Sequence, residues 1–211
     1  MFRKTLLSGI DQFNNLPKNM DVKVDLMLDY LQLLIKWNKA YNLTAIRNPE
    51  EMVSKHILDS LSIASRIDGQ YFLDVGTGAG LPGVILAILY PERQFDLLDS
   101  NGKKTRFLFQ VKTELNLDNI AIFQCRVEHH SVGPVYDGIL SRAFSTLHDM
   151  VKGSNHLLKE TGHFYAMKGV YPDSEIDQLK QMEPGYTVKE ICPLTVPGEN
   201  AERHLVVIGK N

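Results

Sequence analysis

The chain has 211 residues, of which 44% are hydrophobic and 23% charged, a composition typical of a globular domain. Its longest apolar run, 84–90, is far shorter than the roughly 20 residues that a membrane-spanning helix needs, so we expect no membrane partner. The formal net charge of −2 excludes a generally basic nucleic-acid coat protein, and any RNA contact has to come from a local basic patch.

The first part of the chain is predicted to be helical. Residues 1–15 are basic and then only briefly apolar, without a cleavage site of small residues, so we expect no secretory signal. Apolar side chains recur at helical spacing over 21–38. Asn48 is followed by a proline and, three residues after the cap, by an acid, which predicts a capped helix start. We expect this helix to run to about Arg66. Residues 1–68 are therefore predicted to form an N-terminal helical cap.

A different pattern begins at Tyr71, where short apolar runs alternate with helical stretches. This alternation is typical of βαβ units and a parallel sheet. The last two strands lack a convincing helix between them, so we predict an antiparallel C-terminal pair in a mostly parallel sheet of about seven strands. Residues 69–211 are predicted to form one compact Rossmann-like α/β domain, with strands at 71–75, 94–99, 120–124, 137–141, 162–168, 186–192 and 204–209 and helices at 82–90, 102–116, 146–158 and 173–182.

The strongest local signal is a glycine-rich turn between the first strand and the first helix of this domain. Gly76, Gly78, Gly80 and Gly83 permit a tight turn and let a ligand approach the backbone closely. The helix that follows offers free N–H groups to a carboxylate or phosphate. The spacing from Gly78 to Gly83 also matches the dinucleotide pattern GxGxxG, which alone is a weak signal.

Two acids narrow the choice of ligand. Asp99 closes the second strand, where a carboxylate holds ribose hydroxyls of either a dinucleotide or S-adenosylmethionine. Asp74, two residues before Gly76, suits a ligand with an ammonium group and would repel a pyrophosphate. We therefore expect S-adenosyl-L-methionine as the cofactor, bound by this acid pair and by the turn.

The two cysteines, Cys125 and Cys192, have neither the spacing nor the His neighbours of a zinc site, so no metal is expected. They do not make a disulfide scaffold either, which indicates a reducing compartment, and we expect the protein in the cytoplasm.

Several segments, spread in order over nearly the whole chain, carry a resemblance to one known family. They are 37–44 (WNKAYNLT), 56–60 (HILDS), 73–83 (LDVGTGAGLPG), 98–100 (LDS), 126–128 (RVE), 141–144 (SRAF), 167–169 (MKG) and 202–208 (ERHLVVI). On these segments the chain resembles the bacterial 16S rRNA guanine-N7 methyltransferase family RsmG, also called the glucose-inhibited division protein B family. Ala79 stands where that family often has proline.

The resemblance implies a class I methyltransferase fold and methylation of one guanine in the 530 loop of 16S rRNA, with that RNA or the small ribosomal subunit as partner and no obligate protein partner evident. It implies S-adenosylmethionine contacts at Gly76, Leu81, Val127, Glu128 and Arg142. Asn42 and His56 of the cap are then candidates for the substrate side, although His56 fits a core histidine bonded to backbone equally well.

Basic residues follow the carboxyl edge of the predicted sheet. Arg142 follows the fourth strand and Lys168 ends the fifth, at the edge where open α/β sheets bind ligands, so both are candidate catalytic residues. Arg203 opens the last strand and would lie beside them if that strand is antiparallel. Arg126, at the end of the third strand, extends the same rim. We expect Arg126, Lys168 and Arg203 to bind RNA, whereas the basic residues of 103–106 fit a solvated helix face as well.

Methylation of guanine N7 needs no general base, and this agrees with the absence of the motifs that other base methyltransferases use. N7 carries an exposed lone pair, so methyl transfer needs positioning, worth about 7–11 kcal/mol, and no general base. The base must be unpaired or flipped outward, because side chains cannot reach N7 in A-form RNA. Phe144 either stacks on a base or packs in the core. The Asn/Asp-Pro-Pro-aromatic motif of adenine amino methylation is replaced by SRAF at 141–144.

Three other interpretations stay open. A nicotinamide-dependent oxidoreductase would use the GxGxxG match, but we find no catalytic Tyr/Lys or His system and no substrate domain. A non-enzymatic RNA-binding module would keep the fold and lack the activity. A methyltransferase acting on a protein or a small molecule would keep the cofactor and change the substrate.

Overall fold

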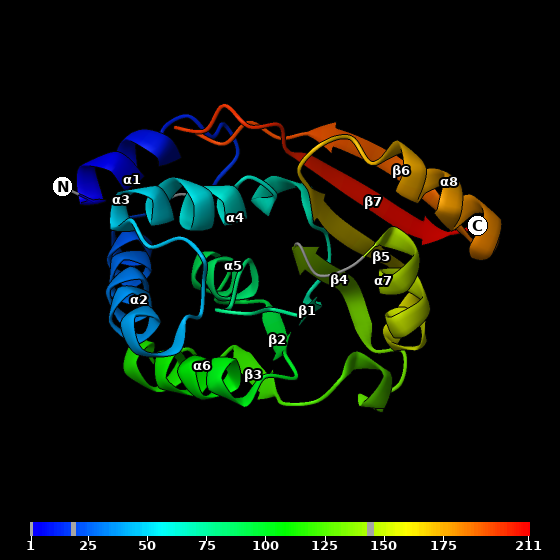
Figure 1. Ribbon diagram of the computed structural model, residues 1–211, viewed down its shortest axis with the longest axis horizontal. Coiled ribbons are helices and arrows are strands. Elements are labelled where there is room, and N and C mark those ends of the chain that lie inside the picture. Colours follow the sequence, from blue (N-terminus) through cyan, green and yellow to red (C-terminus); the bar gives the residue numbers. More distant parts are fainter. Residues whose placement is uncertain (1, 18–19, 143–145) are drawn as a thin grey trace.

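The computed structural model describes residues 2–17, 20–142 and 146–211. Seven strands form one sheet in the order β3-β2-β1-β4-β5-β7-β6, with helices on both faces (Figure 1). This architecture confirms the predicted Rossmann-like α/β fold and all seven strands, which are β1 (Tyr71–Val75), β2 (Gln94–Leu98), β3 (Ile120–Phe123), β4 (Tyr136–Arg142), β5 (Leu158–Lys168), β6 (Tyr186–Pro193) and β7 (His204–Lys210).

The C-terminal strands give the sheet its mixed character. β1 to β5 are parallel, and β7 runs antiparallel to both β5 and β6, which confirms the predicted antiparallel pair and makes β7 the reversed strand. Lys168 at the end of β5 lies opposite His204 at the start of β7. The strand order reverses between β1 and β4, and open α/β sheets bind ligands outside the carboxyl ends of the strands at such a point.

The helices form one layer on each face of the sheet. α5 (Gly83–Leu89) and α6 (Gly102–Leu115) cover one face, with the long α2 (Met20–Tyr41) packed over them, and α7 (Leu147–Ser154) and α8 (Asp173–Met182) cover the other (Figure 1). The buried side chains accordingly form two clusters. The first cluster joins residues of the helical segment to the sheet, and Tyr30 Oη of α2 donates to Ala79 O of the glycine-rich turn at 2.8 Å.

The N-terminal segment departs from one expectation. Asn48 caps a helix as predicted, since its side chain accepts from Glu50 N at 3.0 Å. The helix expected up to Arg66 forms, but it contains a π-helical stretch and ends at Leu61, five residues early. Two turn residues and a 3₁₀ turn then lead to Arg66. With α1 (Phe2–Ile10), this segment comprises α3 (Pro49–Met52), the π-turn η1 (Val53–Leu58), α4 (Asp59–Leu61) and the 3₁₀ turn η2 (Ala64–Arg66).

One strand boundary was also wrong. The helix expected over 146–158 ends at Ser154, a 3₁₀ turn η4 (Asn155–Leu157) follows, and β5 starts at Leu158, four residues early. Its first residues, including Lys159 and Glu160, are exposed and polar, which hid the strand pattern. Between β3 and β4 stands only the 3₁₀ turn η3 (Val127–His129). In the described ranges, no helix has the length and apolar character to cross a membrane.

Candidate active site

The glycine-rich turn joins β1 to α5 and folds back over the sheet edge. The φ angles of Gly76, Gly78 and Gly80 are 66°, 63° and 92°, where other residues are strained. Gly76 N and Thr77 N donate to Leu98 O at the end of β2, at 2.9 and 3.1 Å. This pairing holds the turn against the adjacent strand.

Two of the glycines serve different purposes. A Cβ on Gly78 would meet no atom closer than 3.9 Å, so this residue borders open space. A Cβ on Gly80 would lie 2.4 Å from Val84 and 2.8 Å from Leu108, so packing against α5 and α6 requires this glycine. The predicted cofactor contact of Gly80 stays a prediction, because among the described residues it lines neither of the pockets below.

The Asp74 carboxylate lies completely buried beneath the turn. Its Oδ2 accepts from Thr77 Oγ1 at 2.7 Å and from Gly83 N at 2.8 Å, and its Oδ1 has no hydrogen-bond partner in the described part of the chain. Burial raises the pKa of Asp74 from 3.8 to about 6. The Gly83 N–H, which we expected to be free for a ligand, thus donates to Asp74. Among the described residues that line the two pockets below, Asp74 is absent, so its direct contact with a ligand, which would have to use Oδ1, stays a prediction.

Two adjoining pockets open at the carboxyl edge of the sheet, and Gly76 and Lys104 line both. The larger, of about 480 Å³, lies between the turn, the N-terminal segment and the ends of β4 and β5, and is called the cap-side pocket. The smaller, of about 270 Å³, lies over the ends of β2 and β3, and is called the β3-side pocket. Their combined size suits one cofactor-sized ligand, since ligand pockets span about 300–1,000 Å³.

Asp99 is the acid of the β3-side pocket and is nearly buried. Its Oδ2 accepts from Gly78 N at 3.0 Å and its Oδ1 from Asn101 N at 2.8 Å, while Lys104 Nζ lies 3.4 Å from Oδ2. The carboxylate therefore fixes the turn, with a lysine partly compensating its charge.

The end of β3 completes the same pocket. Arg126, Val127 and Glu128 all line it, Val127 buried and the two charged residues exposed. The short turn η3 brings Glu128 to the pocket that Asp99 also lines. With Gly76 and Val127, four of the residues expected on the cofactor side line this pocket.

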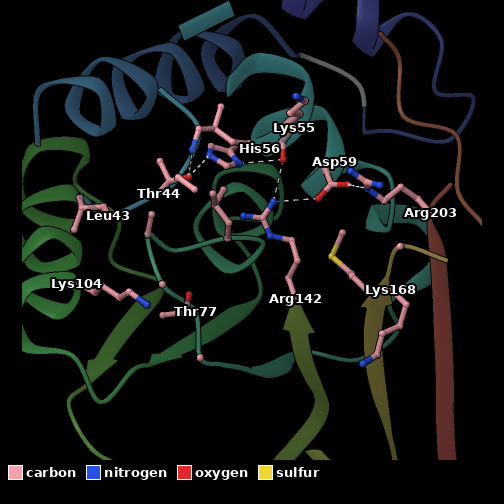
Figure 2. A pocket seen from close by; sticks show the side chains of 18 of the residues that line it. Leu43, Thr44, Lys55, His56, Asp59, Thr77, Lys104, Arg142, Lys168 and Arg203 are labelled. Atoms are coloured by element: carbon pink, nitrogen blue, oxygen red, sulfur yellow. Dashed lines mark hydrogen bonds and ion pairs between the residues drawn. The ribbon is translucent and has the colours of Figure 1, made fainter. Parts of the chain in front are cut away.

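Arg142 occupies the centre of the cap-side pocket (Figure 2). Its Nη1 donates to Asp59 Oδ2 at 3.1 Å and to Lys55 O at 3.0 Å, both in the N-terminal segment. Arg203 Nε donates to the other oxygen of Asp59, at 3.1 Å. The structure therefore brings Arg142 and Arg203 together through an acid that we had not singled out.

Lys168 lines the same pocket, and its side chain turns away from Arg142 (Figure 2). Its Nζ pairs with Glu175 Oε2 at 2.8 Å, and the same oxygen accepts from Leu147 N at the start of α7. Arg142, Lys168 and Arg203, from three distant parts of the chain, thus share one pocket. Arg126 lies on the neighbouring β3-side pocket, and Phe144 lies outside the described residues.

His56 is buried at the wall of the cap-side pocket. Its Nδ1 lies 3.0 Å from Lys55 O, which can only accept, so Nδ1 carries the proton and Nε2 accepts from Thr44 Oγ1 at 3.0 Å. Burial lowers the pKa of His56 to about 4, so the ring is neutral at pH 7. Asn42, with a φ of 51°, is exposed and lies off both pockets. Their substrate contacts stay predictions.

Lys104, Asp59 and Thr77 are among the pocket residues that were not singled out from the sequence. For Lys104 the choice between the basic rim and a solvated helix face was left open, and its position one turn after Asp99, the acid that follows β2, was the available signal. Asp59 stands three residues after His56, on one face of a helical segment, which is a weak signal. Thr77, in the turn itself, was hidden by the glycines.

Comparison with known proteins bears on this geometry. The family described as "GidB: rRNA small subunit methyltransferase G" matches residues 23–206. A protein from Hydrogenovibrio crunogenus named ribosomal RNA small subunit methyltransferase G is 53% identical over 195 residues, 92% of this chain and 88% of its own. A protein of the same name from Marinomonas sp. is 55% identical over 188 residues, 89% of each chain.

Solved structures share the fold at low identity. A SAM-dependent methyltransferase from Aquifex aeolicus superposes with a TM-score of 0.60 at 14% identity, over 76% of this chain and 93% of that one. Such a likeness shows that the sheet and its helices are arranged as in Rossmann-like methyltransferases.

Proposed function

Because the chain belongs to the GidB family of rRNA small subunit methyltransferases G, we propose that it methylates N7 of a guanine in the 530 loop of 16S rRNA. It is an S-adenosyl-L-methionine-dependent rRNA methyltransferase with a Rossmann-like fold. The observation that carries the finer proposal is the junction of two pockets at Gly76. One holds the acids Asp99 and Glu128, and the other holds the cations Arg142, Lys168 and Arg203.

The residues present fit S-adenosyl-L-methionine. The open space beside Gly78 admits a ligand against the backbone, and the unpartnered Oδ1 of Asp74 is an acceptor without a protein donor in the described ranges. Asp99, Val127 and Glu128 would hold the adenosine end in the β3-side pocket. The methionine end would lie in the cap-side pocket, against the residues Gly76, Leu81 and Arg142.

The proposed reaction requires the protein to hold the guanine and the cofactor in the correct relative position. When bound, the cofactor supplies a methyl group on a positively charged sulfur. Guanine N7 has a free lone pair, so no side chain has to remove a proton, and the buried neutral His56 is suited to support the wall without acting as a base. Arg142 and Lys168 are the proposed catalytic residues, because N–H donors at this edge can hold the guanine or its phosphate.

The basic rim supports an RNA substrate. Lys168 and Arg203 line the cap-side pocket and Arg126 lines its neighbour, so a phosphate backbone passing over the edge would meet cations on both sides. The pocket admits a base only after it leaves the duplex, which favours an unpaired or flipped guanine. Asn42, His56 and Phe144 complete the proposed substrate side.

We further propose that 16S rRNA or the small ribosomal subunit is the partner and that the protein works in the cytoplasm. Residues 1–68 act as a cap over the methyltransferase unit 69–211, because Lys55, His56 and Asp59 form one wall of the pocket.

The decisive experiment is incubation of the protein with labelled S-adenosyl-L-methionine and small-subunit RNA or particles that lack the modification. We expect label at N7 of a single guanine in the 530 loop, mapped by mass spectrometry. Label on another base, on an amino group or on protein would overturn the proposal.

Thermal shifts with each cofactor distinguish the oxidoreductase alternative. S-adenosyl-L-methionine should raise the melting temperature and NAD should not. Stabilisation by NAD alone would contradict the cofactor assignment, and cofactor binding without any methyl transfer would favour an RNA-binding module.

A further inference from the structure

Two arginines, one at the end of a strand and one just before another, share one buried carboxylate. Asp59 Oδ2 accepts from Arg142 at the end of β4, and Asp59 Oδ1 accepts from Arg203 just before β7, each at 3.1 Å (Figure 2). The Asp59 side chain is 6% exposed, so solvent and salt screen these ion pairs far less than surface pairs. The N-terminal segment therefore contributes the negative charge, on Asp59, that binds both arginines.

The Arg142 guanidinium is fixed at one end and free at the other. Its Nη1 donates to Asp59 and to Lys55 O, and two acceptors on one nitrogen set the rotation of a planar group. In the described part of the chain, its Nε and Nη2 have no hydrogen-bond partner, and the residue lines the cap-side pocket. The free donors are thus held facing the space that a ligand would occupy.

We propose that Asp59 is a positioning residue, which orients Arg142 toward the cofactor and Arg203 toward the RNA. This inference rests on the proposed function of the pocket. Two cations on one carboxylate leave a net positive charge, so the group still attracts anions. Without the carboxylate, the two guanidiniums would repel each other, and Arg142 would keep a single backbone acceptor.

Asp59→Asn in the full chain tests this role, because it keeps the shape of the side chain and removes its charge. We expect affinity for S-adenosyl-L-methionine, measured by calorimetry, to fall about tenfold, as for the loss of one charge-assisted hydrogen bond. The KM for unmodified small-subunit particles should rise as well, because Arg203 loses its anchor.

A double-mutant cycle of Asp59 and Arg142 tests whether Asp59 acts on the cofactor through Arg142 or only stabilises the fold. If Asp59 acts through Arg142, adding Asp59→Asn to Arg142→Ala should cost no further cofactor affinity. Additive losses would mean that Asp59 acts independently of Arg142, and the inference would be wrong.

The matched control is Asp96→Asn. Asp96 is also buried and accepts from two side chains, Tyr71 Oη and Tyr136 Oη at 2.7 and 2.6 Å, but it lies off both pockets. The Asp96→Asn substitution should lower the melting temperature and leave the affinity for S-adenosyl-L-methionine and the KM unchanged. If Asp59→Asn behaves like this control, Asp59 is only a brace.

Two further outcomes have defined meanings. If Asp59→Asn does not fold, Asp59→Glu retains the charge and shifts the carboxylate, and it should fold yet bind the cofactor at least about threefold more weakly. Wild-type affinity in Asp59→Glu would overturn the inference. If the wild-type protein neither binds S-adenosyl-L-methionine nor labels RNA, the proposed function fails, and this inference fails with it for that separate reason.

Discussion

Replacing Asp74 by asparagine separates the cost of a buried charge from the hydrogen bonds that the same carboxylate accepts. Both bonds, from Thr77 and Gly83, end on Oδ2, and Oδ1 has no partner in the described ranges. In Asp74→Asn, the amide oxygen can take the place of Oδ2 and keep both bonds. The amide nitrogen then takes the place of the unpaired oxygen.

The pKa of Asp74 gives the magnitude. A rise from 3.8 to about 6 on folding means that the ionised carboxylate costs about 3 kcal/mol above pH 6. Because the folded pKa is raised, this cost is absent below about pH 4 and grows between about pH 4 and 6. An unpaired buried amide donor costs about 1–3 kcal/mol. At pH 8 we therefore expect Asp74→Asn to be as stable as the wild type or up to about 2 kcal/mol more stable.

Cofactor affinity should move in the opposite direction. If Oδ1 accepts from the ammonium group of S-adenosyl-L-methionine, its replacement by an amide donor should weaken binding at least about tenfold. Urea unfolding at pH 4, 5 and 8 and calorimetric titration measure the two effects, with the exposed Asp11→Asn as the neutral control. A variant that loses more than about 2 kcal/mol at pH 8 and binds the cofactor normally would refute the reasoning and leave Asp74 as a structural brace.

Further predictions concern the same pocket. Lys168→Ala should leave cofactor affinity unchanged and lower RNA methylation about tenfold in a labelling assay, whereas Asp74→Ala should lose cofactor affinity; equal cofactor losses would contradict this division. In urea unfolding, Gly80→Ala should cost about 2–4 kcal/mol, because its methyl group would overlap Val84, and Gly78→Ala only about 1–2 kcal/mol. The His56 ring, whose pKa is lowered to about 4, should show no NMR titration between pH 5.5 and 8, and an inflection near 6.5 would exclude its buried neutral state.

The strands were predictable because burial on both faces leaves short apolar runs between turn signals. The π-helical form of 53–58 was not predictable. Lys55 O within this segment and Asp59 directly after it bind Arg142, 87 and 83 residues away. Local sequence propensity cannot predict a contact between residues so far apart in the sequence. The start of β5 was missed for a related reason, since its exposed polar residues follow no apolar alternation.

Those site residues were predictable that the order and direction of the strands alone bring to one edge of the sheet. Arg142 and Lys168 follow parallel strands, and their convergence needs only the rule that carboxyl ends share an edge. Which atoms they bind was beyond the sequence. Asp59 meets Arg203 across 144 positions, and nothing near Asp59 indicates that two arginines share it. Asp74 was expected at the pocket surface, and the depth of its carboxylate depends on how Thr77 and Gly83 fold over it.

If RNA binds at the pocket as proposed, the charges there explain how a protein with a net charge of −2 can hold an anionic polymer. Its cations are paired with carboxylates that fix their positions, Lys104 with Asp99 at 3.4 Å and Lys168 with Glu175 at 2.8 Å, while two arginines share Asp59. Pairing lowers the charge available to RNA and reduces the entropy lost on binding, since the side chains are already ordered. Under the proposed function, specificity for one base would come from the fixed directions of a few donors, and a strongly basic surface would be unnecessary.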